Sequence, residues 1–262
     1  MTIEKRDDYF EPKTGRLNAF IGLLTFFTII PIRMYTTIED MAKMAWSMPF
    51  IGAFVGLIGI IIAYFLSNIV NLPGLLVACL VYGFFTLING CHHLDGLLDF
   101  SDAVMYQGSV EDKIKIMRDP ISGTGALASL FLVGICTISC YYSLISENLL
   151  ILILISEISG KIGLLTTCIS SKSGVDGTGK EFIEYLTVPM YLVSIIIFII
   201  ISYLLNPPYG VFGIFGGIIG GGLISLISKK HFKVATGDVL GASNEISRLI
   251  SLILMILIIV NI

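Results

Sequence analysis

Seven long apolar runs dominate the chain, and polar connections separate them. Each run has about the 20 residues that an α-helix needs to cross the hydrocarbon core of a bilayer. The pattern therefore predicts an all-α fold, a polytopic integral membrane helical bundle. The predicted spans cover roughly residues 44–66, 72–89, 124–145, 149–169, 188–205, 209–228 and 246–262.

An eighth apolar segment, residues 17–32, is shorter than the others and has basic residues at both ends. We interpret it as a re-entrant or interfacial N-terminal helix that ends near Pro31. If it crosses the membrane instead, the N-terminus moves to the opposite side while the seven spans keep their orientation.

Composition and charge support a multi-pass protein of the cell membrane. Hydrophobic residues make up 55% of the 262 positions and charged residues 13%, against about 25% charged in soluble domains. The connections near 67–71, 146–148 and 206–208 contain no lysine or arginine, whereas fifteen of the sixteen basic residues fall on the other side of an alternating topology. The positive-inside rule places that side in the cytoplasm, together with the polar loops at 90–123, 170–187 and 229–245.

Without an internal repeat or a linker, residues 1–262 are predicted to form a single transmembrane domain. We expect the lipid bilayer as its surroundings and no nucleic-acid partner. Gly213, Gly217 and Gly221 stand four residues apart on an apolar run, which indicates close helix packing and permits a homo-oligomer.

Three aspartates lie close together after the second span, in the stretch NGCHHLDGLLDFSDAV at residues 89–104. If that span continues as a helix, an advance of about 100° per residue puts Asp95, Asp99 and Asp102 on one narrow face. His92 falls close to that face, and His93 lies farther round the helix. Adjacent carboxylates repel one another unless a cation or protons compensate, and oxygen ligands without cysteine favour Mg²⁺ or Mn²⁺.

Two other interpretations of this stretch stay open. The aspartates form a solvated acidic helix end, although the glycine at 96 and the adjoining lipid boundary count against it. Alternatively, Cys91, His92 and Asp95 bind zinc, but the spacing supplies no fourth ligand for a closed site.

Two further motifs follow in order, KIMRDPISGTGAL at residues 115–127 and TGDVLGASNEIS at 236–247. With HHLDGLLDFSDAV they resemble the pattern of the adenosylcobinamide-GDP ribazoletransferase (cobalamin synthase) family. FFTIIPIR at 26–33 and MPFIGAFVG at 48–56 resemble the early segments of that family, so the likeness spans nearly the whole chain.

The resemblance implies an enzyme that joins adenosylcobinamide-GDP to α-ribazole, or to its 5′-phosphate, with Mg²⁺ as cofactor. The products are adenosylcobalamin, or its 5′-phosphate, and GMP. Asp95, Asp99 and Asp102 become the catalytic, metal-binding carboxylates. His93 matches the catalytic motif histidine, which contacts a phosphate or accepts the proton of the attacking hydroxyl. Helical geometry instead favours His92, which we keep as a substrate-binding candidate.

Other polar residues are candidates for substrate binding. Arg118 and the backbone N–H groups around Gly123 and Thr124 are suited to an anionic leaving group, although SGTG is equally typical of a helix cap and Asp119 of a partner for Arg118. Asp238, Asn244 and Glu245 add oxygen atoms from the last connection, with an N-cap role for Asn244 as the alternative.

The glycine-rich stretch GVDGTGKE at 174–181 does not match a Walker A motif, because Glu181 stands where Ser or Thr is required. Lys180 within it remains a candidate for contact with a substrate phosphate. Glu157 and Lys161 lie four residues apart inside the fourth span, where they form a neutralised pair or line a substrate cavity.

Two other functions are alternatives to a ribazoletransferase. CDP-alcohol phosphotransferases also build a metal site from aspartates on membrane helices, but Asp99 and Phe100 stand where their pattern has Ala-Arg. A cation- or proton-coupled transporter would favour a site at the bilayer midplane between repeated halves, whereas these carboxylates follow a span and no repeat is evident.

Overall fold

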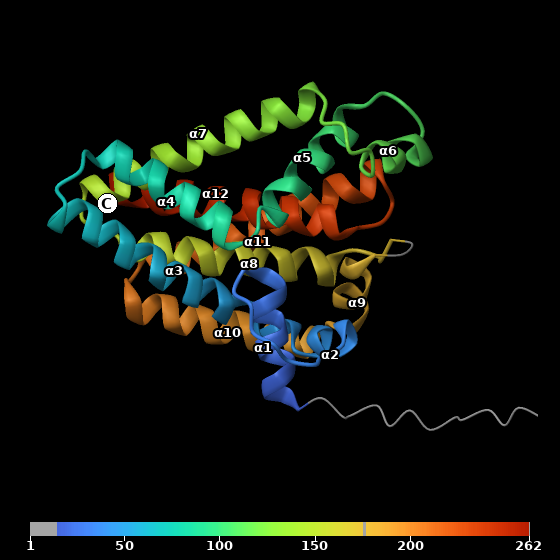
Figure 1. Ribbon diagram of the computed structural model, residues 1–262, viewed down its shortest axis with the longest axis horizontal. Coiled ribbons are helices and arrows are strands. Elements are labelled where there is room, and N and C mark those ends of the chain that lie inside the picture. The colour runs from blue at the N-terminus through green and yellow to red at the C-terminus, as the bar shows by residue number, and fades with distance from the viewer. Residues whose placement is uncertain (1–14, 175–176, 262) are drawn as a thin grey trace, which may run out of the picture.

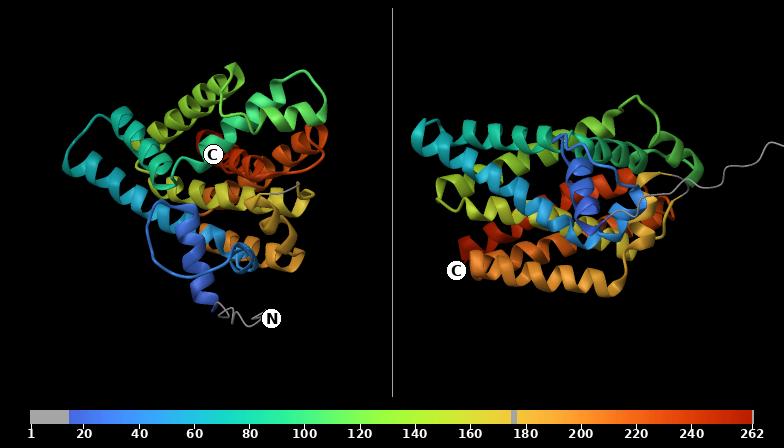
Figure 2. Two further views of the ribbon diagram at one scale, coloured as in Figure 1. Left: turned by 45° about the vertical axis from the view of Figure 1, so that its right-hand side comes forward. Right: turned by 60° about the horizontal axis from the view of Figure 1, so that its bottom comes forward.

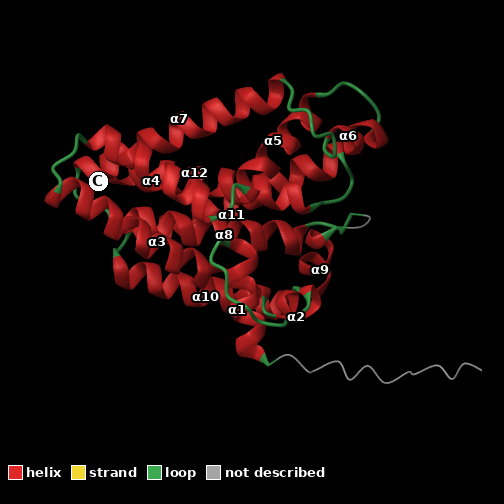
Figure 3. Cartoon of the chain, viewed as in Figure 1, coloured by secondary structure: helices red, strands yellow, loops and turns green. Residues whose placement is uncertain are grey.

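The computed structural model describes residues 15–174 and 177–261, and helices dominate these residues (Figures 1 and 3). The described part of the chain contains no strand, and its one isolated bridge joins Ser173 to Ala235. The helices, including a 3₁₀ turn (η1) and a π-helical turn (η2), are α1 (Arg16–Phe27), α2 (Ile38–Lys43), η1 (Ala45–Ser47), α3 (Met48–Tyr64), η2 (Phe65–Ile69), α4 (Gly74–Ile88), α5 (His92–Met105), α6 (Val110–Ile116), α7 (Thr124–Ser146), α8 (Ile151–Ser170), α9 (Thr178–Tyr185), α10 (Val188–Leu205), α11 (Tyr209–His231) and α12 (Gly237–Asn261).

Six helical segments of the described chain are long and apolar enough to span a membrane. A seventh is counted if α4 and α5, which meet at 90°, form one broken span. The predicted all-α membrane bundle is therefore confirmed. The last span was predicted too short, because α12 begins at Gly237 and not near residue 246. The segment predicted as the end of a loop is thus the start of a transmembrane helix.

Helix α8 forms the centre of the bundle, between α3, α11 and α12 (Figure 2). Within its most apolar stretch, 94% of the residues are buried. Glycines on the neighbouring helices allow this approach: a Cβ on Gly52 of α3 would lie 2.6 Å from the Glu157 carbonyl oxygen, and one on Gly217 of α11 would lie 2.5 Å from that of Ser159. The predicted packing role of the α11 glycines is confirmed.

Helix α1 runs across the direction of the bundle, with its C-terminal end against the other helices (Figures 1 and 2). At 12 residues it is shorter than the spanning helices, as predicted for the N-terminal segment. A hydrogen bond of 2.8 Å from the Ile29 N–H to the Ile88 carbonyl ties the chain after α1 to the end of α4. The end of α1 is thereby fixed beside the start of α5.

The short helices α2, α5, α6 and α9 lie toward the end of the bundle opposite the C-terminus (Figure 1). Two backbone hydrogen bonds, from the N–H of Gly174 to Ala235 and from the N–H of Ala235 to Lys172, join the segment before α9 to the segment before α12. Two connections that are distant in sequence therefore meet at one end of the molecule.

Candidate active site

The chain turns sharply between α4 and α5, immediately before the aspartates. Gly90 and Cys91 adopt left-handed φ angles of 61° and 60°, and the two helix axes differ by 90°. The expectation that the second span continues as one helix through this stretch is therefore wrong. Since α5 begins at His92 and ends at Met105, it nevertheless carries all three aspartates on one helix.

Helices α5 and α12 approach each other most closely at two glycines. A Cβ on Gly96 would lie 2.8 Å from the Asp238 carbonyl oxygen, and a Cβ on Gly241 would lie 3.2 Å from the Gly96 Cα. This contact brings the HHLDGLLDFSDAV and TGDVLGASNEIS motifs together. Asp95 and Asp238 consequently lie on neighbouring helices at the mouth of one cavity.

The carboxylates of α5 and α12 share one electrostatic environment. Burial, followed by the charges of Asp95, Asp238 and Asp102, raises the pKa of Asp99 to about 6. A carboxyl group in such surroundings holds its charge only at a cost unless a positive charge is near. The predicted clustering of Asp95, Asp99 and Asp102 is thus reflected in their interactions, and Asp238 belongs to the same group.

Asp102 has a second relationship that the sequence did not indicate. Its carboxylate accepts a very short hydrogen bond from the Gly123 N–H and another of 2.8 Å from the Ala126 N–H. These groups belong to the N-terminus of α7, where N–H groups lack partners within the helix. The interpretation of SGTG as a helix cap therefore agrees with these contacts. The Asp102 carboxylate is the negatively charged group that caps α7.

The carboxylates of α5 are the candidate ligands for a metal ion. Among the described residues, no three His, Cys, Asp or Glu side chains converge closely enough to hold one ion. Asp95 and Asp99 supply the oxygen atoms that Mg²⁺ prefers, and Mg²⁺ often takes only one or two protein carboxylates, with water and substrate phosphate as the other ligands. Asp95 and Asp99 therefore have suitable chemistry for binding Mg²⁺. That these two and Asp102 together bind one ion remains a prediction.

A cavity of about 500 Å³ opens beside these carboxylates, between α1, α5, α9 and α12. The polar part of its wall contains His92, His93, Asp95 and Asp238. The apolar part is formed mainly by Phe26, Phe27, Leu164, Phe182 and Leu240. The cavity therefore offers a small molecule both apolar contacts and charged groups.

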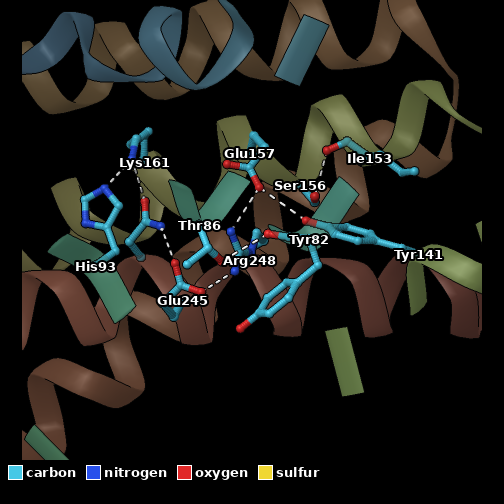
Figure 4. A network of polar contacts seen from close by, with 11 residues as sticks. Tyr82, Thr86, His93, Tyr141, Ile153, Ser156, Glu157, Lys161, Glu245 and Arg248 are labelled. Carbon is cyan, nitrogen blue, oxygen red and sulfur yellow. Dashed lines mark hydrogen bonds and ion pairs between the residues drawn. The ribbon is translucent and has the colours of Figure 1, made fainter. Parts of the chain in front are cut away.

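The two motif histidines have different surroundings. His92 is exposed on the cavity wall, whereas His93 is only 5% exposed and stacks on Phe27 with ring centroids 5.7 Å apart. Lys161 Nζ lies 2.6 Å from His93 Nε2 and 3.0 Å from Asn244 Oδ1 (Figure 4). Because an ammonium group only donates, Nε2 of His93 is the acceptor. The proton of the neutral His93 ring is therefore on Nδ1.

The network continues into the middle of the bundle (Figure 4). The Asn244 amide donates to Glu245 at 3.2 Å, Glu245 forms a very short ion pair with Arg248, and Arg248 donates to Glu157 at 3.2 Å. With Lys161, this chain of contacts contains two positive and two negative side chains, so that its formal charge sums to zero. Charges this deeply buried persist only when they are paired.

Several expectations are corrected by this network. Asn244 and Glu245 lie within α12, seven residues or more after its first residue, so that neither a loop position nor an N-cap role for Asn244 holds. Glu157 pairs with Arg248, and the hydrogen-bond partners of Lys161 are His93 and Asn244. Arg248, counted among the basic residues of the cytoplasmic side, is 1% exposed and lies inside the bundle.

The remaining candidates surround the site at different distances from the cavity. Asp119 accepts a hydrogen bond of 3.0 Å from the Ile121 N–H in its own turn. Together with Asp102, Gly123 and Thr124 it lines a second cavity of about 340 Å³ on the α7 side of α5. Arg118 lies within electrostatic range of Asp238. Lys180 is half-buried on α9 beside Gly179, which lines the first cavity.

Comparison with known proteins agrees with this arrangement. A family model described as cobalamin-5-phosphate synthase matches residues 19–256. The chain belongs to the cobalamin-5-phosphate synthase family. The resemblance found from the three motifs is thereby confirmed.

Individual members of the family align along nearly their whole length. The chain is 31% identical to the adenosylcobinamide-GDP ribazoletransferase of Methanococcoides burtonii, with 92% of this chain and 93% of the relative covered. It is 27% identical to the enzyme of the same name from Clostridium botulinum strain Loch Maree, with 92% and 98% covered. For that of Methanosarcina barkeri the identity is 29%, with 91% of each chain covered. No solved structure matches the chain.

Sequence reasoning missed the apolar wall of this synthase-family cavity. Phe26 and Phe27 belong to the segment interpreted as a re-entrant or interfacial helix, where their resemblance to the family suggested no role in the site. Phe182 follows the glycine-rich stretch in which only Lys180 is a candidate for substrate contact. The sequence places Phe182 close to a candidate phosphate contact, because it is the first aromatic residue after that stretch. Nothing in the sequence pairs it with Phe27, which lies on a different helix.

Proposed function

We propose that this chain joins adenosylcobinamide-GDP to α-ribazole, or to α-ribazole 5′-phosphate, and releases GMP. The observation that carries the proposal is the contact of α5 with α12 at Gly96 and Gly241. It assembles the HHLDGLLDFSDAV and TGDVLGASNEIS motifs around one cavity, although they are more than 130 residues apart in the sequence. Membership of the cobalamin-5-phosphate synthase family and the names of its relatives support the same reaction.

The reaction is a displacement at phosphorus. A ribose hydroxyl oxygen of α-ribazole forms a bond to the phosphorus atom linked to cobinamide, the bond from that phosphorus to the GMP oxygen breaks, and the hydroxyl loses its proton. His92 and Asp95 face the cavity and are suited to accept this proton. His93, whose Nε2 atom accepts from Lys161, is assigned to positioning this wall of the site.

The GMP leaving group is anionic, so positively charged side chains near Asp238 can stabilise its charge. Arg118 lies near this carboxylate and Lys180 is on α9 beside the cavity. We assign both to the phosphates of adenosylcobinamide-GDP, since guanidinium and ammonium groups stabilise the charge that develops on a departing phosphate. The N–H groups at the start of α7 already contact Asp102 and are not assigned to substrate.

Mg²⁺ is part of the proposal as a cofactor. Asp95 and Asp99 would hold it, with Asp102 next to them on the same helix face. When bound, the ion would neutralise charge on the phosphates. The crowding of the carboxylates supports a cation here, because burial and the charges of Asp95, Asp238 and Asp102 together raise the pKa of Asp99.

We further propose that the site lies at the cytoplasmic face of the cell membrane. The connections that form it contain most of the basic residues, and the positive-inside rule assigns such connections to the cytoplasm. The transverse helix α1, with Leu17 exposed at 70%, is suited to rest at the bilayer surface beside the cavity.

The test is a reconstitution. The full chain in detergent or liposomes, given adenosylcobinamide-GDP, α-ribazole and Mg²⁺, should release GMP and form the joined corrinoid. Asp95→Asn and Asp99→Asn should abolish the product while the protein keeps its thermal unfolding transition, and Glu111→Gln, an exposed acidic residue on α6, should remain active. Product formed only from CDP-alcohols, or ion flux without release of GMP, would contradict the proposal.

A further inference from the structure

The cavity of the candidate site contains a group of aromatic rings that the reaction at phosphorus does not use. Phe26 and Phe27, at the end of α1, lie 5.6 and 5.9 Å from Phe182 of α9, measured between ring centroids. Phe27 also stacks on His93. All three phenylalanines line the cavity and form its aromatic wall, and Asp95 and Asp238 line the same cavity.

This aromatic wall is held in place from behind. Phe182 is 2% exposed and Phe27 is 7% exposed. Lys161 Nζ lies 5.3 Å from the centre of the Phe27 ring, on the network that reaches into the bundle. Rings that are already fixed offer a ligand apolar contact without a large loss of side-chain freedom.

The two substrates of the proposed reaction each contain a flat heterocyclic base. The guanine of adenosylcobinamide-GDP has polar donors and acceptors around its edge. The dimethylbenzimidazole of α-ribazole has two methyl groups on its outer edge and no exocyclic polar group. An apolar wall leaves the edge of guanine without hydrogen-bond partners, which costs binding free energy, whereas it suits the methylated edge of benzimidazole.

The size of the cavity agrees with the smaller substrate. Its volume of about 500 Å³ falls in the range of about 300–1,000 Å³ that is typical of sites for small molecules. An adenosylated corrinoid linked to GDP is far larger than such a molecule. The corrinoid must therefore approach from outside, while the nucleoside fits within.

We propose that this cavity binds α-ribazole, with its base against Phe26, Phe27 and Phe182 and its ribose toward His92, Asp95 and Asp238. The assignment rests on the proposed function and makes the phenylalanine wall the determinant of which base is accepted. In this orientation the base is sequestered near α1, and the ribose hydroxyl that attacks phosphorus faces the groups that accept its proton. The aromatic wall and the carboxylates thus select and orient the same molecule.

The experiment measures the two substrates separately. Phe182→Leu removes the ring with little loss of volume, and Thr25→Trp adds a large side chain at a residue that lines the cavity. Because the contact of a base with an aromatic side chain is worth about tenfold or more in affinity, Phe182→Leu should raise the KM for α-ribazole by about that factor. Thr25→Trp should also raise this KM, because the added side chain occupies space in the cavity. The KM for adenosylcobinamide-GDP should change by less than twofold. Phe198→Leu is the matched control, because Phe198 is equally buried and pairs with Phe50 away from the cavity.

A binding measurement keeps the assignment independent of turnover. Equilibrium dialysis of α-ribazole against wild-type protein and the three variants should show weaker binding only for Phe182→Leu and Thr25→Trp. Riboside analogues without the methyl groups, or with adenine as the base, should bind the wild type more weakly, and Phe182→Leu should narrow this difference.

The outcomes separate the two proposals. An active wild type whose α-ribazole affinity is unchanged in both cavity variants would overturn the assignment and leave the function intact. A selective rise in the KM for adenosylcobinamide-GDP would also overturn it, because the wall would then hold guanine. A wild type that neither binds α-ribazole nor releases GMP would contradict the proposed function itself.

Discussion

The side-chain nitrogen of Lys161, on α8, lies 2.6 Å from Nε2 of His93, on α5. This contact links the wall of the cavity to the most deeply buried helix of the molecule. It fixes the orientation of the His93 ring, which also stacks on Phe27. The shape of the cavity therefore depends in part on a polar network that extends from His93 into the bundle.

Removing the Lys161 ammonium should lower activity by disordering this wall. A misplacement of about 1 Å in a catalytic site can reduce the rate by about 100-fold, so we expect a fall in kcat toward that size for Lys161→Met. Lys161→Arg keeps a donor and should recover part of the rate. Steady-state kinetics with both substrates provide the measurement. A folded Lys161→Met protein with the kcat of the wild type would show that the contact positions nothing.

Arg248 should make the largest single contribution to stability among the buried charges. It pairs with Glu157 and Glu245, so Arg248→Leu leaves two buried carboxylates without a cation. Loss of one partner from a buried ion pair typically costs about 3–5 kcal/mol. Thermal and denaturant unfolding in detergent should show this loss, whereas Lys229→Leu, at an exposed position near the end of α11, should change little. Equal small effects for both variants would contradict the role of the network.

The contact between α5 and α12 should tolerate no added carbon atom at Gly96. A Cβ there meets the Asp238 backbone at 2.8 Å, so Gly96→Ala forces the two helices apart. We expect loss of most GMP release, because Asp95 and Asp238 are displaced from each other. The control is Gly83→Ala on α4, where a Cβ meets nothing within 4 Å; there we expect full activity and a gain of about 0.5–1 kcal/mol in helix stability. Equal activity of the two variants would contradict the assembly of the site at this contact.

Asp102 should matter for stability in a way that Asp95 does not. Since its carboxylate binds the N-terminus of α7, Asp102→Ala should cost about 0.5–2 kcal/mol, as for other helix caps. Asp102→Asn retains an acceptor and should lose less, while Asp95→Ala should leave the unfolding transition in place. If Asp102→Ala unfolds at the wild-type temperature, the cap contributes nothing to stability.

The orientation of the bundle is open to direct measurement. In a variant without native cysteines, a cysteine at Gln107, in the exposed connection after α5, should react with a membrane-impermeant maleimide only after the cells are opened. One at Asn148, in the exposed turn between α7 and α8, should react in intact cells. The reverse pattern would place the active site outside.

Much of the fold follows from hydrophobic runs, because a span must be long and apolar whatever it packs against. Local signals also existed where the prediction failed. Asn89-Gly90 is a dipeptide typical of turns, and the chain bends there by 90°. The start of α12 was placed too late because Asp238, Asn244 and Glu245 make its first turns polar. Their polarity reflects the neighbouring site and the buried network, which a hydropathy pattern cannot distinguish from a loop.

The site was only partly accessible to sequence reasoning for a different reason. The aspartates of α5 are close in sequence, so helical geometry was enough to group them. The hydrogen-bond partners of Lys161 and the ion-pair partner of Glu157 are 68 to 91 residues away, whereas Glu157 and Lys161, four residues apart, offered a simpler pairing. Contacts such as these depend on which helices pack together, and spacing along one helix does not determine that.

The pairing of Glu157 with Arg248 has a consequence for biogenesis. Helix α8 enters the membrane during synthesis with a carboxylate whose counter-ion is translated 91 residues later, on the final helix. Until α12 inserts, α8 is a poor lipid-facing segment and a natural target for chaperones and quality-control proteases. A premature stop after α11 should therefore yield a protein that is degraded rather than one that is merely inactive.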